Sequence, residues 1–84
     1  MNLYLISQSE NNNYDTFDSA VVAAKSEEEA KHIHPQCTWG NELQPKWGED
    51  YGTWCKSPNS VNVELIGTSN QKEAGVILAS FNAG

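Results

Sequence analysis

Apolar and polar positions along the chain divide it into four short β-prone segments. Residues 3–6 form an apolar run (LYLI) between polar neighbours, which predicts a first strand that is buried on both faces. Residues 16–24 are rich in β-branched and aromatic side chains and predict a second strand, although their closing alanines also fit a helix. Residues 60–66 alternate apolar and polar positions and predict a half-buried strand, and residues 75–81 predict a last one.

One helix is predicted after the second strand. Ser26 precedes three glutamates, and Glu29 stands where it completes a capping box. The three carboxylates also lie at the positive end of the helix dipole. Pro35 ends the helix because the residue before a proline avoids helical backbone. The pattern therefore predicts a helix of about two turns.

Irregular segments separate these elements. Residues 7–15 are rich in asparagine and predict a turn or loop. Residues 36–59 contain all three tryptophans and both cysteines, show no clear periodicity, and predict a long loop or irregular hairpin. The polar segment 67–73 opens with glycine, so we expect the last two strands to pair as an antiparallel hairpin.

The order of elements predicts an α+β fold in a single domain, residues 1–84. We expect a small antiparallel sheet of four to five strands, with one short helix on one face and a long Trp-rich loop. A chain of this size has a thin core, which the tryptophans or a partner subunit would supplement. The expected inward-facing residues are Leu3, Leu5, Phe17, Val21, Ala30, Ile33, Val61, Val63, Leu65, Val76 and Leu78.

The last predicted strand also suggests self-association. Residues 76–81 are apolar on both faces and contain neither proline nor lysine, so an exposed edge there would invite pairing. We therefore predict a homodimer or larger closed oligomer that buries Ile77 and Phe81. The alternative is a central position for this strand within one chain.

The charge balance excludes two classes of partner. The chain carries 11 acidic and 5 basic side chains, a formal net charge of −6. Nucleic acids and anionic membranes both require basic surfaces, so we expect neither DNA or RNA nor a membrane as partner. No apolar run is long enough for a bilayer span or a signal peptide, so we expect a cytoplasmic location.

Metal and catalytic motifs are weak. His32, His34, Cys37 and Cys55 are metal-type ligands, but their spacing is not that of zinc knuckles. We expect solvent-facing histidines, free thiols and no metal or cofactor. The sequence has no nucleophile elbow and no glycine-rich phosphate loop, so we expect a protein that is not an enzyme.

Aromatic residues in the long loop give the clearest chemical signal. Indole rings stack on nucleobases, with about 1–3 kcal/mol per base. They are also preferred anchors of protein interfaces, or they complete a core, and the sequence leaves these three roles open. For a nucleotide ligand, the aromatic rings would stack on bases and the lysines would meet phosphates. The candidate ligand-binding residues are Tyr14, Trp39, Lys46, Trp47, Tyr51, Trp54 and Lys56.

The acidic helix start gives a second candidate site. Glu27, Glu28 and Glu29 could form part of a surface that imitates a phosphate backbone and blocks a nucleic-acid-binding protein. The competing explanation is a well-capped, solvated helix end.

Several sequence blocks resemble short uncharacterised accessory proteins of tailed bacteriophages and prophages. These blocks are residues 13–24 (NYDTFDSAVVAA), 26–30 (SEEEA), 33–35 (IHP), 63–67 (VELIG) and 76–84 (VILASFNAG). Small phage proteins of this kind often counteract bacterial defence without catalysis. The resemblance implies a counter-defence protein in the host cytoplasm that sequesters a nucleotide second messenger such as a cyclic dinucleotide. The alternatives are an acidic inhibitor of a host defence protein and a structural phage protein without a ligand.

Overall fold

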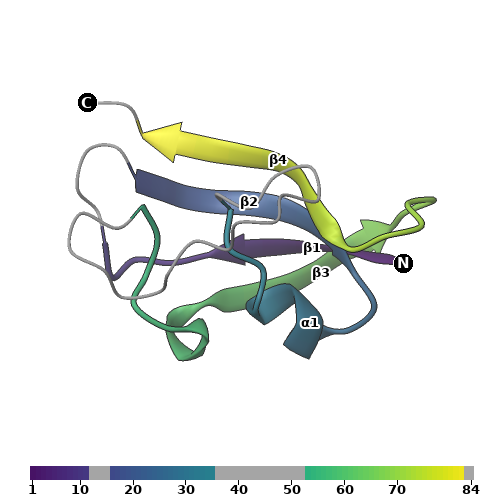
Figure 1. The fold of residues 1–84 in the computed structure, drawn as a ribbon, viewed down its shortest axis with the longest axis horizontal. Coiled ribbons are helices and arrows are strands. Elements are labelled where there is room, and N and C mark those ends of the chain that lie inside the picture. The colour runs from purple at the N-terminus through teal and green to yellow at the C-terminus, as the bar shows by residue number, and fades with distance from the viewer. Residues whose placement is uncertain (12–15, 36–52, 83–84) are drawn as a thin grey trace.

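A computed structural model of the chain describes residues 1–11, 16–35 and 53–82 (Figure 1). These residues form a four-stranded antiparallel sheet with one short helix against it, which is the α+β fold that the sequence predicts. The elements in chain order are β1 (Asn2–Ser7), β2 (Thr16–Ala24), α1 (Glu27–Lys31), the 3₁₀ turn η1 (Pro58–Ser60), β3 (Asn62–Thr68) and β4 (Gly75–Asn82).

Helix α1 starts as predicted but ends earlier. The Ser26 hydroxyl accepts a hydrogen bond from the Glu29 N–H at 3.2 Å, and the Glu29 carboxylate accepts one from the Lys25 N–H at 2.8 Å. The helix is only five residues long, and His32 is its C-cap. The N–H of Ile33 bonds the Ala30 carbonyl at 3.1 Å, a tightened last turn that stops the helix before Pro35 is reached.

The strand order is β3-β1-β2-β4, so β3 and β4 lie at opposite edges of the sheet (Figure 1). The expected hairpin between these two strands is therefore wrong. The edges are three strand spacings apart, about 14 Å, and a connection of about six residues can span up to about 20 Å. Ser69 guides this crossing: its N–H donates to the Met1 carbonyl at 2.7 Å, and its carbonyl accepts from the Met1 ammonium at 3.2 Å.

The core lies on the face of the sheet that α1 covers. Ile6 and Val22 are fully buried there, and Tyr4 is 4% exposed. Val63 and Val76 pack against this core from the two edge strands, and the helix contributes Ala30. The core cluster is Tyr4, Ile6, Ala20, Val22, Ala24, Ala30, Trp54, Cys55 and Val61.

Several residues that were expected to face inward do not, and that expectation is wrong for them. Leu3, Leu5 and Val21 are half-buried on the other face, because Tyr4 pairs with Val22 on the core side. The sequence could not show which face of each strand is buried, because apolar residues occur on both faces of β1 and β2.

The edge strands show the same error. Leu65 pairs with the core-facing Tyr4 and is exposed because β3 is an edge strand, whereas a β-bulge changes the face of Leu78. Leu65 is 57% exposed and Leu78 is 68% exposed, although both were expected in the core. In β4 the bulge residue is Ile77, because Val21 pairs with Leu78 whereas Val22 pairs with Val76. An extra residue of this kind breaks the alternation of faces along a strand.

The side chain of Gln8 bonds residues on both sides of residues 12–15, in the connection between β1 and β2. Its side-chain amide donates to the carbonyls of Asn11 at 2.8 Å and Phe17 at 3.0 Å, and its amide oxygen accepts from the Asn11 N–H at 2.7 Å. Gln8 is buried, so these bonds satisfy a polar group that would otherwise oppose folding. They also fix Asn11, which contacts the Trp-rich part of the chain.

Candidate functional site

The structure places two of the seven candidate ligand-binding residues. Trp54 is 3% exposed and belongs to the core cluster, whereas Lys56 is exposed. Of the possible roles that the sequence left open for the tryptophans, Trp54 therefore has that of completing the core. The other five candidates, Tyr14, Trp39, Lys46, Trp47 and Tyr51, lie outside the described residues.

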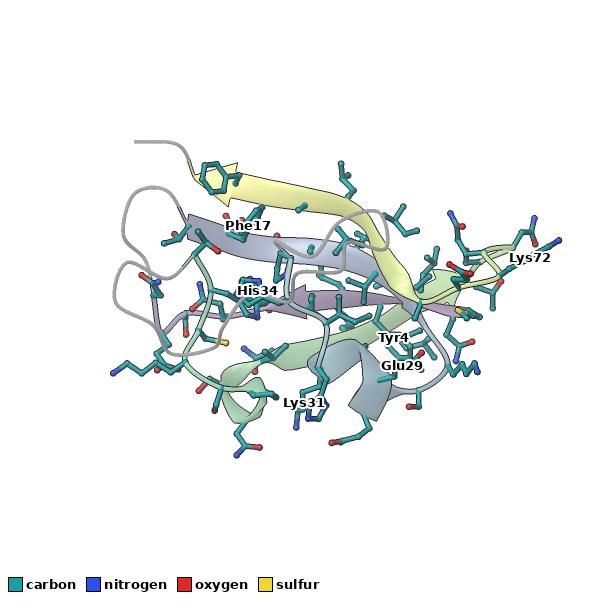
Figure 2. All side chains as sticks on the ribbon, viewed as in Figure 1. Tyr4, Phe17, Glu29, Lys31, His34 and Lys72 are labelled. Carbon is teal, nitrogen blue, oxygen red and sulfur yellow. The ribbon has the colours of Figure 1, made fainter. Side chains whose placement is uncertain are left out.

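The two flanks of segment 36–52 meet in the core. His34 and Pro35 are buried on one flank, and Trp54 and Cys55 are buried on the other. The rings of His34 and Trp54 lie 6.4 Å apart between centroids, tilted by 58° (Figure 2 labels His34). The described residues on either side of segment 36–52 therefore lie close together in the core.

Hydrogen bonds tie the second flank to the sheet. The N–H of Phe17, in β2, donates to the Thr53 carbonyl at 2.7 Å. The side-chain amide of Asn11 donates to the Trp54 carbonyl at 3.2 Å. The buried Nε1 of Trp54 has no acceptor among the described residues. This flank is thus anchored through two of its backbone carbonyls, while the buried indole N–H of Trp54 lacks a partner within the described part of the chain.

Burial keeps the ionisable groups at these flanks neutral. Desolvation lowers the pKa of His34 to about 4, and it raises the pKa of the Cys55 thiol, with a further contribution from the negative charge of Glu10. Cys55 is free, and its Sγ donates to the Ser57 carbonyl at 3.4 Å. A reactive thiolate–imidazolium pair needs the opposite shifts, so this arrangement does not activate the thiol.

The two histidines differ from the expectation that both face solvent. His32 is exposed, and its Nδ1 lies 2.8 Å from the Glu28 carbonyl oxygen. His34 is only 3% exposed, so the expectation is wrong for this residue. A sequence offers no signal for this difference, because the burial of His34 depends on Trp54, far along the chain. Cys37, the other thiol, lies outside the described residues.

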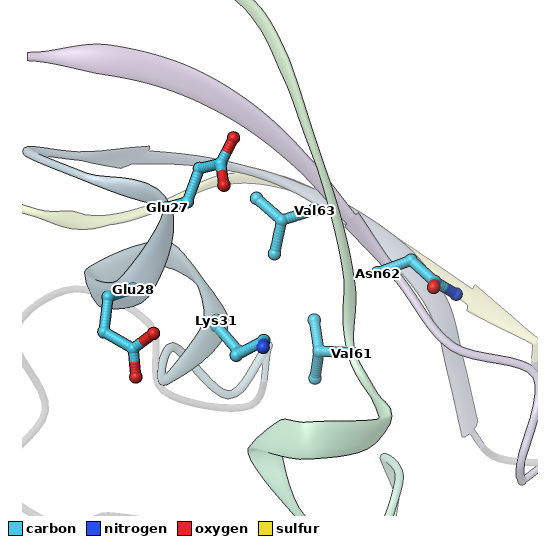
Figure 3. Close-up of a pocket in the computed structure, with 6 residues that line it drawn as sticks. All are labelled: Glu27, Glu28, Lys31, Val61, Asn62 and Val63. Carbon is cyan, nitrogen blue, oxygen red and sulfur yellow. The ribbon is translucent and has the colours of Figure 1, made fainter.

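The acidic helix start lines an open groove against β3. The cavity has a volume of about 270 Å³, with Glu27, Glu28 and Lys31 on the helix side and Val61, Asn62 and Val63 on the strand side (Figure 3). Glu27 and Glu28 are exposed, whereas Glu29 is partly covered and its carboxylate caps the helix. Of the three glutamates, only Glu27 and Glu28 are therefore available to a partner.

Large apolar side chains are exposed at both edges of the sheet. Leu65 and Ile66 on β3 are 57% and 49% exposed. On β4 the exposed fractions are 43% for Ile77, 68% for Leu78 and 46% for Phe81. Ile77 and Phe81 are thus at a sheet edge, and the alternative of a central last strand is wrong.

Neither a metal site nor a membrane helix is found in the part of the chain that the structure describes. Within residues 1–11, 16–35 and 53–82, no group of three or more His, Cys, Asp or Glu is placed to hold a metal ion. No helix in these ranges is long and apolar enough to cross a membrane. Comparison of the chain with protein families, curated proteins and solved structures finds no match.

Proposed function

We propose that this protein binds a ligand without catalysis, through segment 36–52 and its anchored flanks. The observation that carries the proposal is the meeting of the flanks in the core, where His34 and Trp54 lie 6.4 Å apart. Long loops that are fixed at their ends by a rigid scaffold are frequent binding elements. Segment 36–52 carries Trp39, Trp47 and Tyr51, which are side chains suited to flat ligands.

The ligand class that fits these residues is a nucleotide second messenger such as a cyclic dinucleotide. Stacking on aromatic rings needs no basic surface, which suits a chain with a net charge of −6. The phosphates would be met by Lys46 and by Lys56, whose side chain is exposed close to the anchored flank. Together with the resemblance to phage accessory proteins, this supports a counter-defence protein that sequesters the signal in the host bacterium.

The protonation states of the buried flank residues favour a binding role over a catalytic one. His34 and Cys55 are the titratable groups with displaced pKa values among the described residues, and both shifts favour the neutral form. A catalytic cysteine or histidine requires a charged or readily charged group near neutral pH. The shifts therefore fit residues that pack as a support for segment 36–52.

Isothermal titration calorimetry with a panel of cyclic dinucleotides and trinucleotides tests the proposal. We expect one member to bind and Trp39→Ala or Trp47→Ala to weaken its binding by about 5- to 150-fold, the equivalent of one lost stack. Leu65→Ala, at the exposed edge of β3, is the control and should bind as the wild type does. The absence of heat with every member would overturn the proposal, and a chemically altered nucleotide after incubation would overturn its non-catalytic part.

A second candidate function rests on the groove between α1 and β3. Glu27 and Glu28 are exposed beside Val61 and Val63, a combination that suits a basic surface of a host defence protein. Glu27→Lys with Glu28→Lys should then abolish binding to that protein, and added salt should weaken it. Glu73→Lys, in the exposed turn before β4, is the matched control. Binding that is unchanged by added salt and by charge reversal would contradict this candidate. The alternative of a structural phage protein without a ligand would then be the one left to test.

A further inference from the structure

Strand β4 forms an edge of the sheet without the usual protection. It is hydrogen-bonded to β2 on one side, and in the part of the chain described here no strand pairs with its other side. Its sequence, GVILASFN, contains no charged residue and no proline. Edge strands are normally guarded by such residues. Ile77 is the extra residue on β4, and a second register shift lies at residues 80–81, where β2 has the extra residue Asp18.

The apolar surface at this edge continues onto the face of the sheet opposite α1. Leu5 pairs with Val21, and Val21 pairs with Leu78, so these three side chains form a row across β1, β2 and β4. Leu5 and Val21 are half-buried, whereas Leu78 at the end of the row is 68% exposed. The row therefore ends at Leu78, on the edge strand β4.

Among the described residues, three exposed acidic side chains lie toward the other edge of the sheet, whereas Asp18 is exposed on β2, the neighbour of β4. Glu27 and Glu28 are on α1, which lies on the β3 side of the sheet, away from β4 (Figure 1). Glu64 is on β3 itself. A basic partner would be drawn to that side, whereas β4 itself carries no charged side chain. An uncharged edge on a chain of net charge −6 is thus where a second copy can approach with the least repulsion.

We propose that β4 pairs antiparallel with β4 of a second copy of this chain, which joins two four-stranded sheets into one. A two-fold axis perpendicular to the sheet keeps the same face of both copies on the same side. The apolar rows that end at Leu78 then lie on the same face of the joined sheet, and the unpaired outer backbone of β4 becomes paired. The two β3 strands are seven spacings apart, about 34 Å, which is about four Debye lengths at physiological salt.

Light scattering coupled to gel filtration tests this pairing with two matched variants. Leu78→Lys places a charge on β4 at a side chain that is 68% exposed, and Leu65→Lys does the same on β3 at one that is 57% exposed. Both positions tolerate lysine in a single chain because both are solvent-accessible. We expect the wild type and Leu65→Lys to have twice the chain mass of 9.3 kDa and Leu78→Lys to have the mass of one chain.

Several outcomes would overturn the pairing. A wild-type mass of one chain at micromolar and tenfold higher concentrations would mean that the edge is covered in another way. A dimer that persists in Leu78→Lys, or that is lost in Leu65→Lys, would place the interface elsewhere, and a mass above two chains would exclude the closed pair. Circular dichroism of both variants confirms that each is folded, and if Leu78→Lys is unfolded, Ile77→Lys with Ile66→Lys as its control asks the same question.

Discussion

Protonation of His34 should make the protein less stable in mild acid. Its side chain is 3% exposed, and burial lowers its pKa from 6.5 in the unfolded chain to about 4 in the folded one. Because the folded-state pKa is lower, the unfolded chain binds the proton first as the pH falls. The stability is therefore complete above about pH 6.5 and is lost progressively between about pH 6.5 and pH 4.

The size of the effect follows from the two pKa values. Between about pH 7.5 and pH 5, the free energy of unfolding should fall by up to about 2 kcal/mol through this one group. For a chain of this size, that corresponds to a loss of about 1–2 M in the urea midpoint. Carboxylates also titrate in this range, so a variant without the imidazole is needed to isolate the contribution of His34.

Urea unfolding followed by tryptophan fluorescence, at one fixed protein concentration, measures this difference. His34→Gln keeps a hydrogen-bonding side chain and should lose about 2 kcal/mol less than the wild type between the two pH values. His32→Gln removes an exposed imidazole and serves as the matched control. If wild type and His34→Gln lose the same stability on acidification, burial does not hold His34 neutral, and the reasoning is refuted.

Three further predictions test the helix start, the phase of the sheet and the buried thiol. Ser26→Ala removes the acceptor for the Glu29 N–H and should lower the free energy of unfolding by about 1 kcal/mol in urea titrations; an unchanged midpoint would contradict the cap. Ile6→Ala should cost about 2–5 kcal/mol and Leu5→Ala about 1 kcal/mol, because Ile6 is fully buried and Leu5 is half-buried; the reverse order would contradict the assigned faces. In a Cys37→Ser background, Cys55 should react with Ellman's reagent far more slowly in buffer than in urea, because it is buried and its pKa is raised; equal rates would contradict its burial.

The local elements of this fold could be predicted from the sequence because local chemistry determines them. β2 begins and ends at the predicted residues, and Ser26 caps the helix as its position before three glutamates indicates. The faces of the strands could not be predicted, since Leu3, Tyr4, Leu5 and Ile6 present apolar side chains to both sides. The strand order was missed because neighbouring strands usually pair, whereas here β1 occupies the position beside β3.

The candidate sites show the same division. A helix start with a capping box predicts the exposure of Glu27 and Glu28 and the capping role of Glu29, whereas the choice of the Lys25 N–H as the partner of Glu29 depends on the turn before the helix. The burial of Trp54 and His34 depends on contacts between residues far apart in the chain. A sequence shows that such side chains are present, but the packing of distant segments decides whether they face a ligand or the core.

The distribution of side-chain size links the thin core to the proposed pairing. Within the part of the chain that the structure describes, four of the ten buried apolar residues are alanines, at positions 20, 23, 24 and 30. Small side chains let a helix of five residues lie close to the sheet, but they bury little apolar area. The larger side chains of Ile77, Leu78 and Phe81 are instead exposed on β4. Apolar area that a single chain leaves in water at an unguarded edge would be removed from water by a second copy, so pairing through β4 should also raise the stability of each chain as protein concentration increases.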